Sequence, residues 1–187
     1  MILDTLATSA LEQEHRMILQ VITRMATVAD ELDHGKKIEP AVLQEFLEFF
    51  RVFVEQAHHK KEELILFVAL EKKGVPANGC PLATLRTDHV KGQVFLRDLA
   101  DCASAYLRTG GAAANALARA LRHIAAFYAG HIWTENYVLL PMANKCLSSD
   151  EQDALCEEFT RVDSETSPDF YPHFEKMAEE LGREVSI

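Results

Sequence analysis

The sequence predicts an all-α protein, an up-down antiparallel four-helix bundle with a short helical C-terminal extension. Strand signals are weak, because no stretch alternates apolar and polar residues for long. Four long segments instead place apolar residues along one helical face. The connections between these segments are short, which favours antiparallel neighbours. The chain has 187 residues, enough for one domain with a full hydrophobic core.

Residues that start and stop helices divide the chain. Pro40 is a favoured first-turn residue, and Gly74 is a favoured stop. We expect the four long helices at about residues 4–30, 40–73, 81–109 and 112–146. Ser148 and Glu151 then predict a capping box that opens a fifth helix, and a last helical piece follows residue 167. The expected units are a bundle over residues 1–147 and a helical extension, packed on it, over 148–187.

Composition and charge exclude several classes of partner. The chain is 48% hydrophobic and 26% charged, which is typical of a globular protein. Its formal net charge of −10 gives an acidic surface that repels phosphate backbones, so no nucleic-acid partner is expected. No apolar run approaches the roughly 20 residues that a membrane span needs, so we expect no membrane partner.

The N-terminal residues and the cysteines predict a cytoplasmic protein. Residues 1–10 contain neither Lys nor Arg, so they lack the basic start of a signal peptide. The cysteines form no CxxC pair, and their wide spacing suits neither a disulfide framework nor a zinc ribbon. We expect reduced thiols at all four positions, Cys80, Cys102, Cys146 and Cys156. A monomer and a homodimer both fit the sequence.

Two matched motifs carry the functional prediction. His58 and Glu62 in the second helix repeat the spacing of His131 and Glu135 in the fourth, and both motifs read His-x-x-x-Glu. Residues i and i+4 lie on one face of a helix, so each motif presents an imidazole beside a carboxylate. His59 and the residue four after it share the spacing. Only the pairing that starts at His58 aligns the apolar residues 66–67 with 139–140.

These polar pairs fall on the apolar faces of their helices. His58 shares a narrow stripe with Val54 and Ile65, and the stripe of His131 is similarly apolar. The first and third helices each aim one histidine inward, His15 and His89. Burying so many polar groups is costly unless they are paired, and two divalent cations would satisfy all six side chains.

The donor types favour iron. Neutral imidazoles and carboxylates suit iron, and few ligands per ion leave positions open for a small molecule. Facing helices of a bundle build such sites from inward side chains. A structural zinc site is the weaker interpretation, because such sites favour Cys and four ligands. HExxH, P-loop and dinucleotide motifs are absent from the sequence, so those enzyme classes have no support.

The motifs resemble those of the hemerythrin-like, His-His-Glu cation-binding domains. The resemblance covers roughly residues 8–145 and rests on "EQEHRMI", "HHKKEELILF", "TDHVKGQ" and "HIWTENYVLLPMA". It implies two iron ions, with the two glutamates and an oxo or hydroxo group bridging them. The ligands that it implies are His15, His58, Glu62, His89, His131 and Glu135.

The chain departs from the oxygen-carrying hemerythrins at two positions. The carriers use a second histidine four residues on in the third helix, where this chain has Gln93. Their last carboxylate is an Asp five residues after its His, whereas Glu135 comes four after. Four His and two Glu resemble instead the bacterial proteins linked to repair of iron–sulfur centres. His59 occupies the position of an additional ligand in iron-sensing relatives, and either ligates here or faces a solvated groove.

The resemblance implies a protein that handles O2, peroxide or nitric oxide at a di-iron centre. Consumption of peroxide or nitric oxide would make it an enzyme, with Tyr128, one turn before His131, as a proton donor. The alternatives are a non-enzymatic sensor or carrier of O2 or iron, and an iron–sulfur-centre repair protein.

Several neighbouring residues are expected to play lesser parts. Glu14 is expected either at the surface or behind a ligand, where it would orient an imidazole. The pair Lys60–Lys61 is expected to be solvated. Trp133 and Tyr137 are expected to pack between helices.

Overall fold

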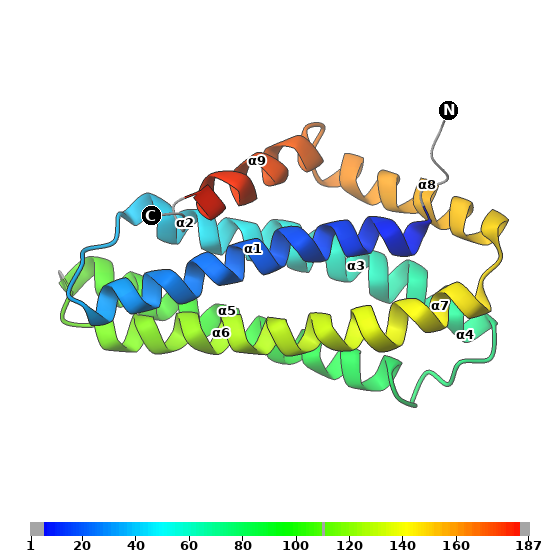
Figure 1. Ribbon diagram of the computed structural model, residues 1–187, viewed down its shortest axis with the longest axis horizontal. Helices are drawn as coiled ribbons and strands as arrows, with labels where there is room; N and C mark the ends of the chain where they lie inside the picture. The colour runs from blue at the N-terminus through cyan, green and yellow to red at the C-terminus, as the bar shows by residue number, and fades with distance from the viewer. Residues whose placement is uncertain (1–5, 110, 184–187) are drawn as a thin grey trace.

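The computed structural model describes residues 6–109 and 111–183, and every regular element in these ranges is helical (Figure 1). The predicted helix start at residue 4 lies outside the described residues. The other predicted boundaries fall within a few residues of those observed, and the prediction of an all-α fold is confirmed. In chain order the elements are α1 (Ala7–Asp33), α2 (Pro40–Glu48), η1 (Phe49–His58), α3 (His59–Lys61), η2 (Glu62–Leu66), α4 (Phe67–Lys72), α5 (Leu82–Thr109), α6 (Ala114–Thr134), η3 (Glu135–Leu139), α7 (Leu140–Cys146), α8 (Ser149–Thr166) and α9 (Phe170–Arg183).

The second and fourth long helices contain π-helical turns. The elements α2, η1, α3, η2 and α4 follow one another without a break, as do α6, η3 and α7. Glu62 is the first residue of η2, and Glu135 is the first residue of η3. Each His-x-x-x-Glu motif therefore ends where the backbone changes to i→i+5 hydrogen bonding. Such turns are rare in proteins, and those that do occur often lie at functional sites.

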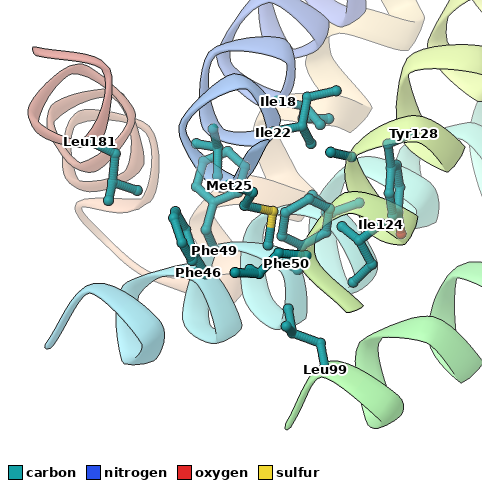
Figure 2. Close-up of a cluster of buried hydrophobic side chains, with 14 of the residues drawn as sticks. Ile18, Ile22, Met25, Phe46, Phe49, Phe50, Leu99, Ile124, Tyr128 and Leu181 are labelled. Carbon is teal, nitrogen blue, oxygen red and sulfur yellow. The ribbon is translucent and has the colours of Figure 1, made fainter. Parts of the chain in front are cut away.

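Two apolar clusters fill the bundle, one on each side of the predicted ligands. The larger contains Phe46, Phe49 and Phe50, packed against α1 and α6 (Figure 2). The smaller contains Leu11 and Leu66 and lies toward the other end of the bundle. Along α1, for example, Leu11 of the smaller cluster precedes His15, and the next buried apolar residues belong to the larger cluster. The polar site thus separates the two parts of the core.

The C-terminal helices α8 and α9 lie along α1 (Figure 1). Ser148 and Glu151 form the predicted capping box at the start of α8. The apolar face of α9 joins the larger cluster, where the ring of Phe170 stacks on that of Phe53 with centroids 5.6 Å apart. The extension therefore completes the core and is more than a surface decoration.

Two sequence expectations about individual side chains are wrong. Trp133 and Tyr137 are 59% and 68% exposed, because His131 and Glu135 occupy the inward face of the same helix. Lys61 is 1% exposed, although it was expected to be solvated. Within residues 6–109 and 111–183, no helix combines the length and apolar character that crossing a membrane requires.

Candidate metal centre

The structure brings all six predicted ligands together in the core. Their donor atoms fall into two groups, and within each group the atoms lie no more than 4.8 Å apart. Glu62 belongs to both groups, and His59 joins the first. All of these side chains are buried. The first group is His59, Glu62, His89 and His131, and the second is His15, His58, Glu62 and Glu135.

His58 and His59 both face the site, although they are adjacent in sequence. His58 is the last residue of the π-helical η1, and His59 begins α3. In a wider π-turn, successive side chains are separated by a smaller angle than in an α-helix, so neighbours can share one side. A regular α-helical repeat places only one of the two histidines on the inward face, which is why the sequence left His59 open.

The two glutamates each reach histidines from more than one helix. The Oε1 atom of Glu135 lies 2.9 Å from Nε2 of His131, and its Oε2 lies 3.2 Å from Nε2 of His15. The Oε2 atom of Glu62 lies 3.3 Å from Nε2 of His89, and its Oε1 lies 3.8 Å from Nε2 of His58. Each carboxylate thus spans the space between two histidines, as a bridge between two ions would.

The donor atoms that face this space have no hydrogen-bond partners among the described residues. A buried polar atom without a partner is costly, so a group of them is rare in a folded protein. A metal ion would satisfy nitrogen and carboxylate donors together. The unsatisfied atoms are Nε2 of His15, His58 and His89, both ring nitrogens of His59 and His131, and both carboxylate oxygens of Glu62 and Glu135. The residues present therefore fit a metal pair.

Three histidines are held from behind through Nδ1. His15 donates to Oδ1 of Asn136 over 2.6 Å. His58 donates to Glu14 over 2.8 Å. His89 donates to Glu63 over 2.6 Å. Such bonds fix the tautomer and leave Nε2 free to ligate. The sequence did not predict the part of Asn136. Its place directly after the glutamate of the second motif is the signal that could have indicated it.

Two other histidines lack such a hydrogen bond among the described residues. Nδ1 of His131 has no partner, and its ring lies parallel to that of Phe127 at 6.1 Å. The ring of His59 stacks on that of His89 at 3.8 Å. Its Nδ1 lies 3.5 Å from Oε1 of Glu55. Packing holds these two imidazoles in place of a hydrogen-bonded carboxylate or amide.

The electrostatics of the site show carboxylates competing with burial. Burial lowers the pKa of His89, but the neighbouring carboxylates of Glu135, Glu62 and Glu63 outweigh it and raise the pKa to about 11. The pKa of His15 rises to about 9 for the same reasons. His59 has its pKa lowered well below the usual 6.5 by burial and by the neighbouring imidazoles, so it stays neutral, as ligation requires.

Tyr128 lies at the edge of the site. Its hydroxyl donates to Oε1 of Glu55 over 3.1 Å. Burial, followed by the charge of Glu55, raises the pKa of Tyr128 well above 10, so the phenol keeps its proton. A Cβ on Gly92 would lie 2.6 Å from the hydroxyl oxygen, so glycine is what allows the two helices to hold Tyr128 there. The proton-donor role of Tyr128 stays a prediction.

The cysteines lie outside the site. Cys80 is exposed and the other three are partly buried, and no disulfide bond joins any of them within residues 6–109 and 111–183. Neither of the two donor groups found among the described residues includes a cysteine. The donor set is therefore nitrogen and oxygen alone, which suits iron better than structural zinc.

Comparison with known proteins identifies the family. The family model of the hemerythrin HHE cation binding domain matches residues 6–143. A comparison with curated proteins finds no match. The matched residues make up most of the chain and include both donor groups. The chain belongs to the hemerythrin HHE cation-binding domain family.

Proposed function

We propose that this chain is a non-haem di-iron protein that handles a small redox ligand, namely O2, peroxide or nitric oxide. The observation that carries the proposal is the group of buried donor atoms without hydrogen-bond partners, drawn from all four long helices. Bound iron would supply the redox chemistry and the open coordination positions. Membership of a cation-binding family supports the binding of a metal at this site.

The two donor groups suggest how the ions would be shared. One would be held by His59, His89 and His131, and the other by His15 and His58. Glu62 and Glu135 would bridge the pair, together with an oxo or hydroxo group. In this proposal His59 is a seventh ligand, in addition to the six that the family resemblance implies.

The chain's own residues would control access and protons. The donors are buried between two apolar clusters, which exclude bulk water from the centre. Tyr128 keeps its proton and lies beside His59, with ring centroids 6.1 Å apart. It would hold that proton at the phenol oxygen until a bound ligand needs it.

The remaining parts of the proposal concern the whole chain. The four long helices would run up and down as an antiparallel bundle over residues 1–147, with 148–187 as an extension packed on it. The end of the family match at residue 143 supports this division. We propose a cytoplasmic protein, a monomer or homodimer, whose partner is the small redox ligand, with neither nucleic acid nor membrane as a partner.

The first test is the iron content of aerobically purified protein, with its visible spectrum. The expected result is about two irons per chain and absorption from an oxo-bridged pair. Stopped-flow mixing of the reduced protein with O2, peroxide and nitric oxide then identifies the ligand. One zinc, or no metal after iron loading, would refute the di-iron proposal, and an iron-loaded protein that reacts with none of the three would refute the redox role.

An iron or O2 sensor is the second candidate. It is favoured by the same unsatisfied donors, because a site whose ligands otherwise lack partners makes folding depend on metal. Circular dichroism of the metal-free and iron-loaded protein tests it. A loss of helicity without iron supports a sensor, and equal helicity and stability in the two states contradict it.

A further inference from the structure

A buried lysine lies directly behind one candidate ligand. Lys61 is on α3, three residues after His58, and is 1% exposed. A lysine is almost never fully buried unless its charge is paired. Its ammonium group therefore needs partners that the sequence motif does not supply.

Those partners form a continuous series of side-chain contacts that reaches the metal site. Nζ of Lys61 lies 2.5 Å from Oε1 of Glu14 and 2.5 Å from Oδ1 of Asp163. The other oxygen of Glu14 accepts the Nδ1 hydrogen of His58 over 2.8 Å. The sequence of contacts is Asp163, Lys61, Glu14, His58, and it joins α8, α3, α1 and η1.

The C-terminal extension builds the pocket that holds the lysine. Asp163 is on α8, beyond the family match that ends at residue 143. The ring of Phe170 on α9 lies 5.7 Å from Nζ of Lys61, within range of a cation–π contact. Both contacts come from residues that are not part of the matched cation-binding domain.

The charges of Glu14, Lys61 and Asp163 depend on one another. Burial by itself would raise the pKa of Glu14, but the charge of Lys61 and the hydrogen bond from His58 outweigh it and lower the pKa. Burial raises the pKa of Asp163, and Lys61 offsets only part of that rise. Lys61 therefore pairs with two carboxylates at once, Glu14 on the side of His58 and Asp163 on the side of α8.

We propose that Asp163 and Lys61 are positioning residues for the metal centre, acting through Glu14 to fix the imidazole of His58. The C-terminal extension is then part of the apparatus that orients a ligand. A carboxylate behind a ligating histidine sets its tautomer, orientation and basicity. This inference rests on the proposed function only for its effect on metal binding.

The chain offers a matched control on the same two helices. Lys60 and Glu165 also pair between α3 and α8, with Nζ and Oε2 3.4 Å apart, but both side chains are exposed. An exposed pair of this kind contributes little to stability. Glu165→Gln therefore removes one carboxylate of α8 without changing the buried contacts that join Asp163 to His58.

The experiment compares Asp163→Asn, Asp163→Ser and Glu165→Gln in the full-length protein. The Asp163 side chain is 21% exposed, so both substitutions leave a site that water can reach and are expected to fold. The rate of iron release to a chelator is measured for each. We expect release about tenfold faster for the Asp163 variants, at the lower end of the range for residues behind metal ligands. The rate for Glu165→Gln should equal that of the unaltered protein.

A second measurement needs no metal. In the metal-free protein with labelled histidine, NMR reports the Nδ1 hydrogen that His58 donates to Glu14. The Asp163 variants should shift that signal or speed its exchange, whereas Glu165→Gln should not. If iron binding fails altogether, the di-iron proposal falls, and this signal still decides the positioning role. An unchanged signal with unchanged iron release, or a loss of thermal stability alone, would overturn the inference.

Discussion

The two His-x-x-x-Glu motifs have the same spacing, but their surroundings differ. In each, the glutamate opens a π-turn and its carboxylate faces histidines of two helices. Behind the first motif, His58 is held by Glu14, which is paired in turn with Lys61. Behind the second, the Nδ1 atom of His131 has no hydrogen-bond partner among residues 6–109 and 111–183.

This difference shows that the motif specifies only the inner surface of the site. What lies behind each motif comes from residues outside it, on the same helix or on other helices. The first is held by buried charges from α1 and α8, and the second by aromatic packing, including Phe127 against His131. Hydrogen-bonded ligands are fixed in tautomer and orientation, whereas packed ones are fixed in position alone. The two halves of one metal centre should therefore respond differently to substitution.

The largest expected effect comes from Glu62, the carboxylate that belongs to both donor groups. Glu62→Ala removes a donor from both groups, so iron content should fall from about two per chain to well below one. Metal analysis after iron loading measures it, with circular dichroism to show that the helices persist. Gln56→Ala, an exposed change on the same helix, is the control. Full retention of two irons would show that neither donor group depends on Glu62 to bind its ion.

The pH dependence of stability separates the metal-free site from the loaded one. His15 and His89 have folded-state pKa values of about 9 and 11, above the ordinary 6.5. Their contribution to the free energy of unfolding is complete below pH 6.5 and is lost as the pH rises through the folded-state pKa values. The melting temperature of metal-free protein should therefore fall above pH 6.5, by on the order of 10 °C.

Iron-loaded protein should lack this slope of melting temperature against pH, because ligation has already removed the protons from the two imidazoles. Thermal unfolding between pH 6.5 and 9.5 makes the comparison. His123→Gln, which changes an exposed histidine outside the site, should keep the slope of the metal-free protein. A flat profile without metal would mean that these two imidazoles are not protonated in the folded chain.

The carboxylates behind the ligands should differ with their burial. Glu14 is 3% exposed and Glu63 is 36% exposed at the side chain. Glu14→Gln should weaken iron binding by about 100-fold and Glu63→Gln by about tenfold, the two ends of the usual range. Competition with a chelator measures both affinities. Equal losses would indicate that burial does not strengthen the hydrogen bond to His58.

The smallest expected effect concerns the approach of Tyr128 to α5. Gly92→Ala places a Cβ 2.6 Å from the Tyr128 hydroxyl oxygen and should destabilise the fold by about 1–3 kcal/mol. Gly130→Ala is the matched control, because a Cβ there meets nothing within 4 Å. That change should stabilise the helix by up to about 1 kcal/mol. Urea unfolding compares the two, and a neutral Gly92→Ala would show that Tyr128 moves aside freely.

The helices and the inward ligands could be predicted from the sequence, because both follow from local periodicity. Apolar stripes located four long helices, and i, i+4 spacing placed His58 beside Glu62. Ser148 and Glu151 predicted their capping box in the same way. All of these features depend on residues within a few positions of one another.

Features that depend on backbone irregularity or distant contacts were missed. The inward direction of His59 requires the π-turn of η1, which a regular helical repeat does not anticipate. The burial of Lys61 requires Asp163, about a hundred residues away, and the hydroxyl of Tyr128 requires Gly92. The exposure of Trp133 follows once the inward face of α6 is occupied by the ligands.

The π-turns have a consequence for insertions and deletions. A π-turn holds one residue more than the α-helical turn that it replaces, while the helix on either side keeps its faces. Deleting a single residue from Glu135–Leu139 would restore a regular helix and leave both apolar clusters aligned. The shortened chain would keep its fold and lose the positions of Glu135 and Asn136. In this protein, metal binding is therefore encoded in the length of a helix as well as in its ligands.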